Sequence, residues 1–139
     1  MPETPLILAI DNGTQSIRAL LFDTQGNLLG KGKQEIEPYF SEQPGWAEQH
    51  PEYFWDNLGI ACQQLWQTTS ARPEQVVGVT VTTQRGTVVN LDRGGKPLRP
   101  AIIWLDQRRT RDYPRLPWYW RWPVAALGQG ETLRQFQSK

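Results

Sequence analysis

The sequence is poor in the residues that build disulfides, zinc sites and nucleophilic triads, because its 139 residues include one cysteine, Cys62, and one histidine, His50. A single cysteine excludes an internal disulfide framework, and a single histidine excludes a metal cluster made of histidine and cysteine. A serine or cysteine triad would have to use His50, which lies between Gln49 and Pro51 and is poorly placed for that role. Chemistry must therefore come from carboxylate, amide, hydroxyl and guanidinium groups.

The chain also lacks a large charge of either sign and a long hydrophobic run. Its 15 basic and 14 acidic residues give a net charge of +1, so no global field favours nucleic acid or an anionic membrane as a partner. The apolar run over residues 6–10 is too short to span a bilayer and follows no basic leader. With 38% hydrophobic residues, these features predict one packed domain in the cytoplasm, without a membrane or nucleic-acid partner.

Three strands are predicted in the first 37 residues. A buried strand over 6–10 ends at Asp11, a strand over 16–23 follows, and a more polar strand over 28–37 is typical of a sheet edge. Asn12-Gly13 and residues 24–27 supply the two turns. The opening of the chain is therefore predicted to be a three-stranded antiparallel meander.

A helix and further strands are predicted after the meander. Apolar residues recur at helical spacing over 51–69. Strands are predicted over 76–82 and 87–92, with a turn at 93–96 and a short apolar stretch at 101–104. Beyond residue 112 the periodicity fails among prolines and tryptophans, and 132–139 resembles the start of a helix that is cut short. This order, β-β-β-α-β-β, indicates an α/β fold that is incomplete.

The residues around the first turn have the composition of a phosphate-binding hairpin. A glycine in a tight hairpin lets backbone N–H groups point at one spot, and neighbouring hydroxyl and amide groups add donors. A carboxylate at the end of the preceding strand, Asp11, can hold Mg²⁺ through water. The alternative is an ordinary turn capped by Asp11, which spacing alone does not exclude. Neither GxxxxGK[ST] nor GxGxxG, the common nucleotide-binding patterns, occurs.

Two other polar segments follow predicted strands. Gln84-Arg85 comes after the strand over 76–82 and can both donate and accept hydrogen bonds, as a grip on vicinal hydroxyls requires. Trp104 offers a flat indole wall for the C–H face of a sugar, with Asp106 close by in the sequence. The alternatives are a polar turn at Gln84-Arg85 and a buried tryptophan beside a surface ion pair at 104–109.

Tryptophans also gather near the end of the chain. Trp118, Trp120 and Trp122 alternate with other residues, including Arg121. Base stacking on nucleic acid is one interpretation of such a stretch. The neighbouring prolines and the neutral net charge favour the other interpretation, apolar packing against further chain.

Taken together, these segments resemble the FGGY carbohydrate kinases, the family of glycerol kinase and xylulokinase within the actin-like ATPase superfamily. The residues from Asp11 to Asp23 look like the first phosphate motif of the family, and Gly45-Trp46-Ala47-Glu48-Gln49 with Pro51 and Trp55 is similar to its GWxEQ segment. Gln84-Arg85 looks like the sugar-contacting turn, and residues 101–108 resemble the AIxWxDxR segment. The resemblance covers 6–110 and implies the ribonuclease-H-like half-domain of such kinases, with 111–139 as an irregular, truncated end.

The resemblance implies a role for each matched residue. Asp11 would organise Mg²⁺, and Gln84 and Arg85 would bind the sugar or polyol, with Trp104 as an apolar wall. The phosphates of ATP would lie against Gly13, Thr14, Gln15, Ser16 and Arg18. In glycerol kinases a glutamate follows the arginine of the sugar turn, whereas Gly86 follows here. This departure makes glycerol doubtful and favours a larger polyol or a ketose.

The resemblance also implies what residues 1–139 do not supply. The aspartate that deprotonates the sugar hydroxyl lies further along the chain in this family, so no catalytic base is expected here. We therefore expect an N-terminal piece of a sugar kinase, inactive alone, whose exposed apolar surface favours homo-oligomers. The alternatives are a non-catalytic carbohydrate-binding or association module, and another actin-like or chaperone-type ATPase, which would share only the phosphate hairpin.

Overall fold

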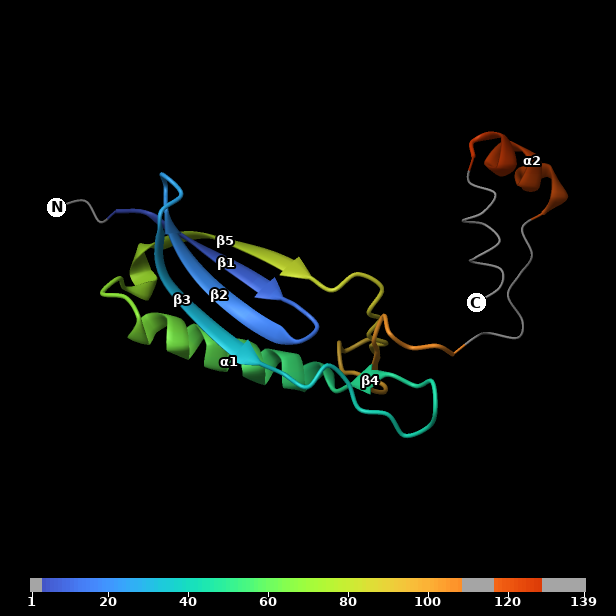
Figure 1. Ribbon diagram of the computed structural model, residues 1–139, viewed down its shortest axis with the longest axis horizontal. Coiled ribbons are helices and arrows are strands. Elements are labelled where there is room, and N and C mark those ends of the chain that lie inside the picture. Colours follow the sequence, from blue (N-terminus) through green and yellow to red (C-terminus); the bar gives the residue numbers. More distant parts are fainter. Residues whose placement is uncertain (1–3, 109–116, 129–139) are drawn as a thin grey trace.

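The computed structural model describes residues 4–108 and 117–128 (Figure 1). The strands are β1 (Leu6–Asn12), β2 (Ser16–Asp23), β3 (Leu28–Glu35), β4 (Glu48–Gln49), β5 (Val76–Thr83) and β6 (Ala101–Ile102). The helices are α1 (Pro51–Gln67), the short 3₁₀ helix η1 (Pro73–Gln75) and α2 (Trp118–Ala126). The predicted meander, central helix and following strand begin at the predicted residues and end within two residues of them.

The main sheet has four strands in the order β3-β2-β1-β5. The β1–β2 and β2–β3 pairs are antiparallel, which confirms the predicted meander, and β5 lies parallel to β1. A parallel neighbour requires a long crossover, which α1 and η1 provide. In this register Asp11 faces Arg18 on one side and Thr82 on the other. A second, two-stranded sheet joins β4 to β6.

The core lies between the sheet and α1. Ile17, Ala19 and Leu21 alternate along β2 and are fully buried against Ala61 and Leu65 of α1. This alternation is the period of a strand with one buried face, and it places Arg18 and Leu20 on the opposite face. The alternation along β2 therefore separates a face that packs on the core from a face that carries Arg18.

Two glycines of β3 let α1 approach the sheet closely. A Cβ atom at Gly32 would lie 1.9 Å from the carbonyl oxygen of Ala61, and one at Gly30 would lie 3.0 Å from Leu65 Cδ1. The helix also covers the outer edge of β3: Thr68 Oγ1 accepts a hydrogen bond from Lys31 N–H at 3.2 Å, and Gln64 Oε1 accepts one from Lys33 N–H at 3.1 Å. Side chains of α1 thus satisfy backbone groups that a further strand would otherwise pair with.

The strand predicted over 87–92 is wrong. Within this segment Val88 forms a single bridge with Ile102, and Leu91 forms one with Pro97. Its adjacent valines, Val88 and Val89, have high strand propensity, but Ile102 already pairs with Glu48 of β4, and β4 and β6 are only two residues long each. The turn predicted at 93–96 is present, with Gly95 at φ +82°.

The irregular end predicted for 111–139 is wrong in part, because α2 forms within it. Pro117 stands just before the first helical residue, where the helix needs no N–H from it, and Pro123 lies inside the helix. Trp118, Trp120 and Trp122 are 56–79% exposed, so the described chain does not contain the packing partner expected for them. The helix start predicted at 132–139 falls outside the described residues. No described helix has the length and apolar character needed to cross a membrane.

Candidate functional site

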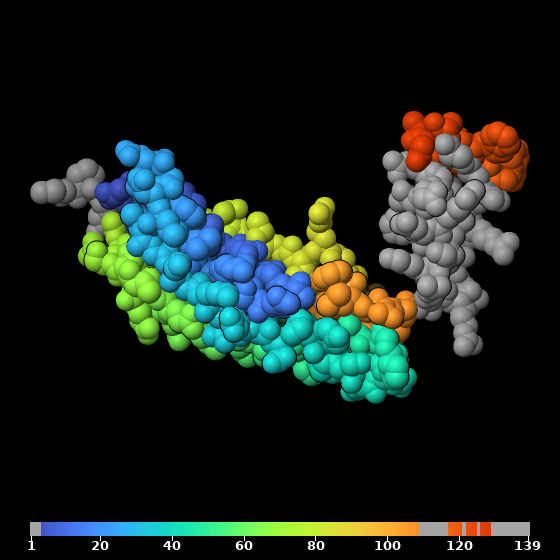
Figure 2. All heavy atoms as spheres, in the orientation of Figure 1, coloured from blue at the N-terminus to red at the C-terminus, as the bar shows by residue number. Residues whose placement is uncertain are grey.

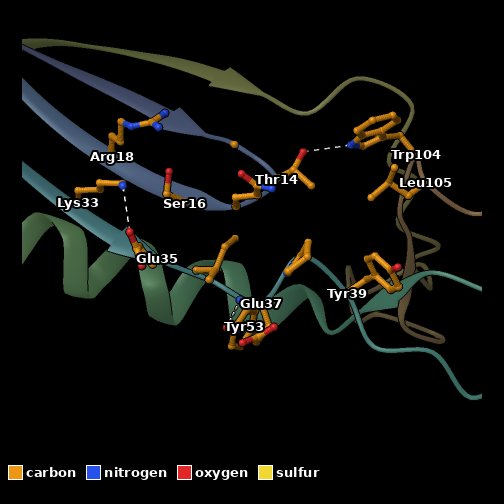
Figure 3. Close-up of a pocket in the computed structure, with 14 residues that line it drawn as sticks. Thr14, Ser16, Arg18, Lys33, Glu35, Glu37, Tyr39, Tyr53, Trp104 and Leu105 are labelled. Atoms are coloured by element: carbon orange, nitrogen blue, oxygen red, sulfur yellow. Dashed lines mark hydrogen bonds and ion pairs between the residues drawn. The ribbon is translucent and has the colours of Figure 1, made fainter.

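The β1–β2 hairpin forms one wall of an open pocket of about 1070 Å³. Six residues predicted from the sequence line it, namely Gly13, Thr14, Gln15, Ser16, Arg18 and Trp104. Figures 2 and 3 show the blue hairpin beside the segment that carries Trp104. The structure therefore brings most of the predicted phosphate site and the predicted sugar wall to one cavity.

One hydrogen bond joins these two parts of the pocket. The indole N–H of Trp104 donates to Thr14 Oγ1 at 3.1 Å (Figure 3). Trp104 is half exposed, at 51%, and lines the pocket. The interpretation of Trp104 as a simply buried tryptophan is thereby wrong.

The hairpin turn is formed by residues 13–15 and is closed by a backbone hydrogen bond. Gly13 N–H donates to the carbonyl of Ser16 at 3.1 Å, and a Cβ atom at position 13 would lie 3.0 Å from that oxygen. This close backbone approach favours glycine at position 13. Because the Gly13 N–H is used inside the turn, donors for a phosphate would have to come from its neighbours.

Asp11 and Arg18, predicted to bind metal and phosphate, pair with each other across β1 and β2. Arg18 Nη1 lies 2.6 Å from Asp11 Oδ2, and the hydroxyl of Thr82 donates to Asp11 Oδ1 at 3.0 Å. Both charged side chains are more than 40% exposed, so water and ligands can reach them. Lys33 is the register partner of Arg18 on β3. A cross-strand row of Lys33, Arg18, Asp11 and Thr82 thus runs beside the hairpin.

Gln84 and Arg85 lie at the end of β5 but do not line the pocket. Gln84 Nε2 donates to the carbonyl of Gly13 at 3.0 Å, so it fixes the hairpin. Arg85 is exposed and makes no hydrogen bond or ion pair with the described residues. Gly86 has φ +78°, and a Cβ atom there would lie 3.3 Å from Trp104 Cβ. The turn after β5 therefore packs its backbone against the indole wall.

Comparison with known proteins agrees with this arrangement. A family model described as the N-terminal domain of the FGGY family of carbohydrate kinases matches residues 6–116. The chain belongs to the FGGY family. The α/β fold, a partial actin-like half-domain, is the one that its sequence predicts.

The proteins that this FGGY chain matches include glycerol kinases and xylulose kinases. The glycerol kinase of Deinococcus radiodurans is 42% identical over 115 residues, which cover 81% of this chain and 22% of that protein. A solved xylulose kinase from Rhodospirillum rubrum has a TM-score of 0.66 and 31% identity, over 74% of this chain and 21% of that one. A gluconate kinase from Lactobacillus acidophilus, at 18% identity and a TM-score of 0.65, shares the fold. The chain spans about a fifth of the length of the curated relatives it matches.

The opposite wall of the FGGY pocket consists of residues that the sequence analysis missed. They come from the end of β3, the loop after it and the start of α1, and they are Lys33, Glu35, Ile36, Glu37, Pro38, Tyr39 and Tyr53. Lys33 Nζ lies 3.1 Å from Glu35 Oε1, and the hydroxyl of Tyr53 accepts a hydrogen bond from Glu37 N–H at 3.0 Å. The polar composition of β3 indicated only an exposed sheet edge. A sequence pattern of this kind does not show which other segment of the chain lies opposite that strand.

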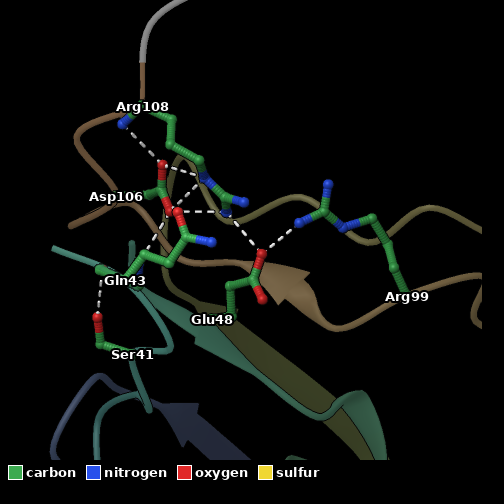
Figure 4. A network of polar contacts seen from close by, with 7 residues as sticks. Ser41, Gln43, Glu48, Arg99, Asp106 and Arg108 are labelled. Atoms are coloured by element: carbon green, nitrogen blue, oxygen red, sulfur yellow. Dashed lines mark hydrogen bonds and ion pairs between the residues drawn. The ribbon is translucent and has the colours of Figure 1, made fainter. Parts of the chain in front are cut away.

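A charged network fixes the segment that carries Trp104 (Figure 4). Buried Glu48 pairs with Arg99 and, at 2.7 Å, with Arg108 Nη2, which also lies 2.7 Å from Asp106 Oδ2. The guanidinium of Arg108 lies 4.3 Å from the centre of the Trp46 ring. This network therefore connects the 45–49 segment to the 101–108 segment. The ion pair that was predicted at the surface near 104–109 is part of this partly buried network.

Acid is expected to destabilise the segment that carries Trp104. Burial alone raises the pKa of Asp106, but hydrogen bonds from the Arg108 side chain and from Ala47 N–H lower it from 3.8 to about 2. Because the folded pKa lies below the ordinary value, Asp106 stabilises the fold above pH 3.8, and this contribution declines as the pH falls toward 2. Thermal unfolding followed by circular dichroism should show that decline, and Asp106→Asn should flatten it. An equally steep decline in Asp106→Asn would contradict the assignment, and Asp56→Asn on exposed α1 surface is the control.

Proposed function

We propose that this chain is the N-terminal part of an ATP-dependent kinase that phosphorylates a hydroxyl group of a sugar or polyol. The observation that supports the proposal is the hydrogen bond from Trp104 to Thr14, which joins the proposed sugar-binding tryptophan to the proposed phosphate-binding hairpin in one pocket. Phosphoryl transfer depends mainly on holding the two substrates in line and stabilising charge between them. A pocket lined by both proposed binding surfaces supports the first part of that requirement, the positioning of the two substrates.

In this proposal the hairpin binds the phosphates of ATP, and Asp11 holds Mg²⁺. Thr14, Ser16 and Arg18 line the pocket, with the Thr14 hydroxyl directed at Trp104 (Figure 3) and the Arg18 guanidinium paired with Asp11. Mg²⁺ commonly uses one or two carboxylates together with substrate phosphates and water. A single half-exposed carboxylate such as Asp11 fits that donor set, and the described residues hold no cluster of three or more metal-binding side chains. The bound ion would neutralise charge on the transferred phosphoryl group.

The sugar or polyol is proposed to lie against Trp104, with its hydroxyls held by Arg85 and Gln84. Position 86 has no side chain, and its positive φ and its contact with Trp104 both disfavour one. No carboxylate therefore extends from this turn toward the indole, which favours a larger polyol or ketose over glycerol. Among the relatives, both glycerol kinases and xylulose kinases are found.

The catalytic base is proposed to lie outside residues 1–139, so that this chain alone is inactive. We further propose that the protein acts in the cytoplasm, without a nucleic-acid or membrane partner, and that the chain forms homo-oligomers. The second candidate function is a non-catalytic carbohydrate-binding module, which the half-exposed Trp104 also favours. That candidate requires sugar binding without any response of the hairpin to nucleotide.

The two functions are distinguished by nuclear magnetic resonance on the ¹⁵N-labelled chain. A ketose such as D-xylulose is expected to shift the indole N–H signal of Trp104, and ATP with Mg²⁺ is expected to shift the amides of Thr14 and Gln15. Arg85→Ala should weaken the response to sugar by roughly 10- to 100-fold, corresponding to about 1.5–3 kcal/mol for hydrogen bonds to a charged group. Arg93→Ala, in the exposed turn at 93–96, is the matched control.

Each result decides between the candidates. Shifts at Trp104 with sugar and none at the hairpin with Mg-ATP would favour the binding module. Absence of both responses at millimolar ligand would contradict the proposed site. Equal sugar affinity in Arg85→Ala and in the unchanged chain would remove Arg85 from it.

A further inference from the structure

The hydrogen bond between Trp104 and Thr14 can run in one direction only. An indole nitrogen donates a hydrogen bond and cannot accept one, whereas a threonine hydroxyl has one hydrogen and two lone pairs. In the contact of 3.1 Å between Trp104 Nε1 and Thr14 Oγ1 (Figure 3), the hydroxyl oxygen is therefore the acceptor. This leaves the hydrogen of the Thr14 hydroxyl available for a second partner.

The described residues supply no acceptor for that hydrogen. Within them, the bond from Trp104 is the one hydrogen bond that the Thr14 side chain makes, and Thr14 lines the open pocket. The hydroxyl hydrogen is thus free to donate to a molecule in the pocket. The oxygens of an ionised phosphate accept hydrogen bonds strongly and do not donate them, so they match this donor.

The backbone that carries Trp104 is held on both sides of the indole. The preceding residue, Ile103, is 1% exposed, and its N–H donates to the carbonyl of Ala47 at 3.0 Å. Asp106, two residues further on, accepts a hydrogen bond from Ala47 N–H at 2.8 Å. The indole N–H is therefore a fixed donor, and it restricts the rotation of the Thr14 side chain in the turn between β1 and β2.

We propose that Trp104 is a positioning residue for the phosphate site, because its N–H orients the Thr14 hydroxyl as a donor to a phosphate oxygen of ATP. This inference rests on the proposed function, in which the hairpin binds ATP. It gives the indole a second role, separate from contact between its ring and a sugar. A hydroxyl that accepts one hydrogen bond also becomes a stronger donor in the next. Trp104 thereby raises nucleotide affinity without touching the nucleotide.

A contact from Gln84 to the backbone of the same turn supports this role. Gln84 Nε2 donates to the carbonyl of Gly13 at 3.0 Å, and Gln84 Oε1 accepts from the hydroxyl of Thr87 at 3.3 Å. Gln84 and Trp104 thus reach two successive residues of the turn across 71 and 90 positions. One contact fixes the backbone and the other orients the side chain, so both prepare the turn for a phosphate.

A double-mutant cycle on the ¹⁵N-labelled chain tests the proposal, with Mg-ATP as the ligand and the Gln15 amide signal as the readout. Trp104→Phe keeps an aromatic ring but has no N–H, and it should raise the Kd for Mg-ATP about 2- to 10-fold, as loss of one typical hydrogen bond does. Thr14→Val removes the hydroxyl and should raise the Kd about 10- to 100-fold, as loss of a hydrogen bond to a charged group does. In the Thr14→Val background, Trp104→Phe should have no further effect.

Two controls separate orientation of the hydroxyl from general damage to the fold. Thr14→Ser keeps a hydroxyl and should bind Mg-ATP nearly as tightly as the unchanged chain. Trp55→Phe removes an indole N–H from a residue of α1 that is 74% exposed, and it should leave the Kd unchanged. Circular dichroism confirms that each variant is folded.

The indole N–H signal of Trp104 gives a second measurement, which needs no substitution at residue 104. Mg-ATP should shift this signal in the unchanged chain, and the shift should be lost in Thr14→Val. If Trp104→Phe does not fold, this measurement decides: an indole signal that ignores Mg-ATP, or one that still responds in Thr14→Val, would overturn the inference.

The outcomes also separate this inference from the proposed function. Equal Kd values for Mg-ATP in Trp104→Phe and the unchanged chain would overturn the inference and leave the proposed function standing. So would an effect of Trp104→Phe that is equally large with and without Thr14→Val, because Trp104 would then act independently of the hydroxyl. An unchanged chain in which Gln15 gives no response to Mg-ATP would remove the proposed nucleotide site, and the inference with it.

Discussion

Changing Asp11 to asparagine is expected to abolish phosphoryl transfer while leaving sugar affinity nearly unchanged. The enzyme for this test is a hybrid in which residues 6–116 of this chain replace the matching segment of the Deinococcus radiodurans glycerol kinase, which is 42% identical to it. Asparagine keeps the size of Asp11 but removes the charge that is proposed to hold Mg²⁺. Loss of one preorganised charge contact in an active site typically costs about 100- to 1000-fold in kcat.

Steady-state release of ADP measures the effect, with KM for the sugar as the second readout. Asp56→Asn, on the exposed surface of α1, removes a carboxylate outside the pocket and should leave both constants unchanged. If the Asp11→Asn hybrid kept a normal kcat and the same Mg²⁺ requirement, the metal role of Asp11 would be refuted. A large rise in KM for the sugar would instead indicate that the pairing of Asp11 with Arg18 supports the sugar wall.

Replacing Gly32 with alanine is expected to destabilise the fold by about 3 kcal/mol or more, as severe overpacking does. The added Cβ would lie 1.9 Å from the carbonyl oxygen of Ala61 and 2.6 Å from the amide nitrogen of Leu65. Both contacts are with helix backbone, which cannot rotate away as a side chain can. Helix α1 would have to move off the sheet, and the buried contacts of Ala61 and Leu65 would be lost with it.

Urea unfolding followed by circular dichroism measures this loss. Gly59→Ala is the matched control, because the same substitution on the exposed side of α1 meets no atom within 4 Å. Alanine at that helical position should stabilise the chain by about 0.5–1 kcal/mol. Similar stability changes in the two variants would show that α1 does not pack as closely on β3 as the structure describes.

The local elements of the fold were predictable because their signals are local. Alternation along β2 identifies its buried face, and Pro51 together with helical spacing identifies α1. The strand predicted at 87–92 failed for a non-local reason, since its valines lack a long neighbour with which to pair. Helix α2 was missed because Pro123 was interpreted as a break, although the helix continues through it.

The site was predictable on one side only. The hairpin residues and Trp104 stand in recognisable segments, and the structure brings them together in the pocket. The hydrogen bond between Trp104 and Thr14 joins residues that are 90 positions apart in the sequence, and motif spacing cannot reveal such a contact. Glu37, Tyr39 and Tyr53 were missed because each is an ordinary residue in its own segment. They become part of a pocket only through the path of the loop between β3 and α1.

The bond between Trp104 and Thr14 also has a consequence for the order in which the chain folds. The hairpin, β3 and α1 make contacts between neighbouring segments, which close short loops at small entropic cost. Gln84 and Trp104 reach the hairpin across 71 and 90 positions, so their contacts close much longer loops. Contacts of such length generally form late and slow folding. During synthesis the phosphate-type turn can thus be in place before the wall beside it has left the ribosome, so among the described residues the pocket is completed after the hairpin that forms its first wall.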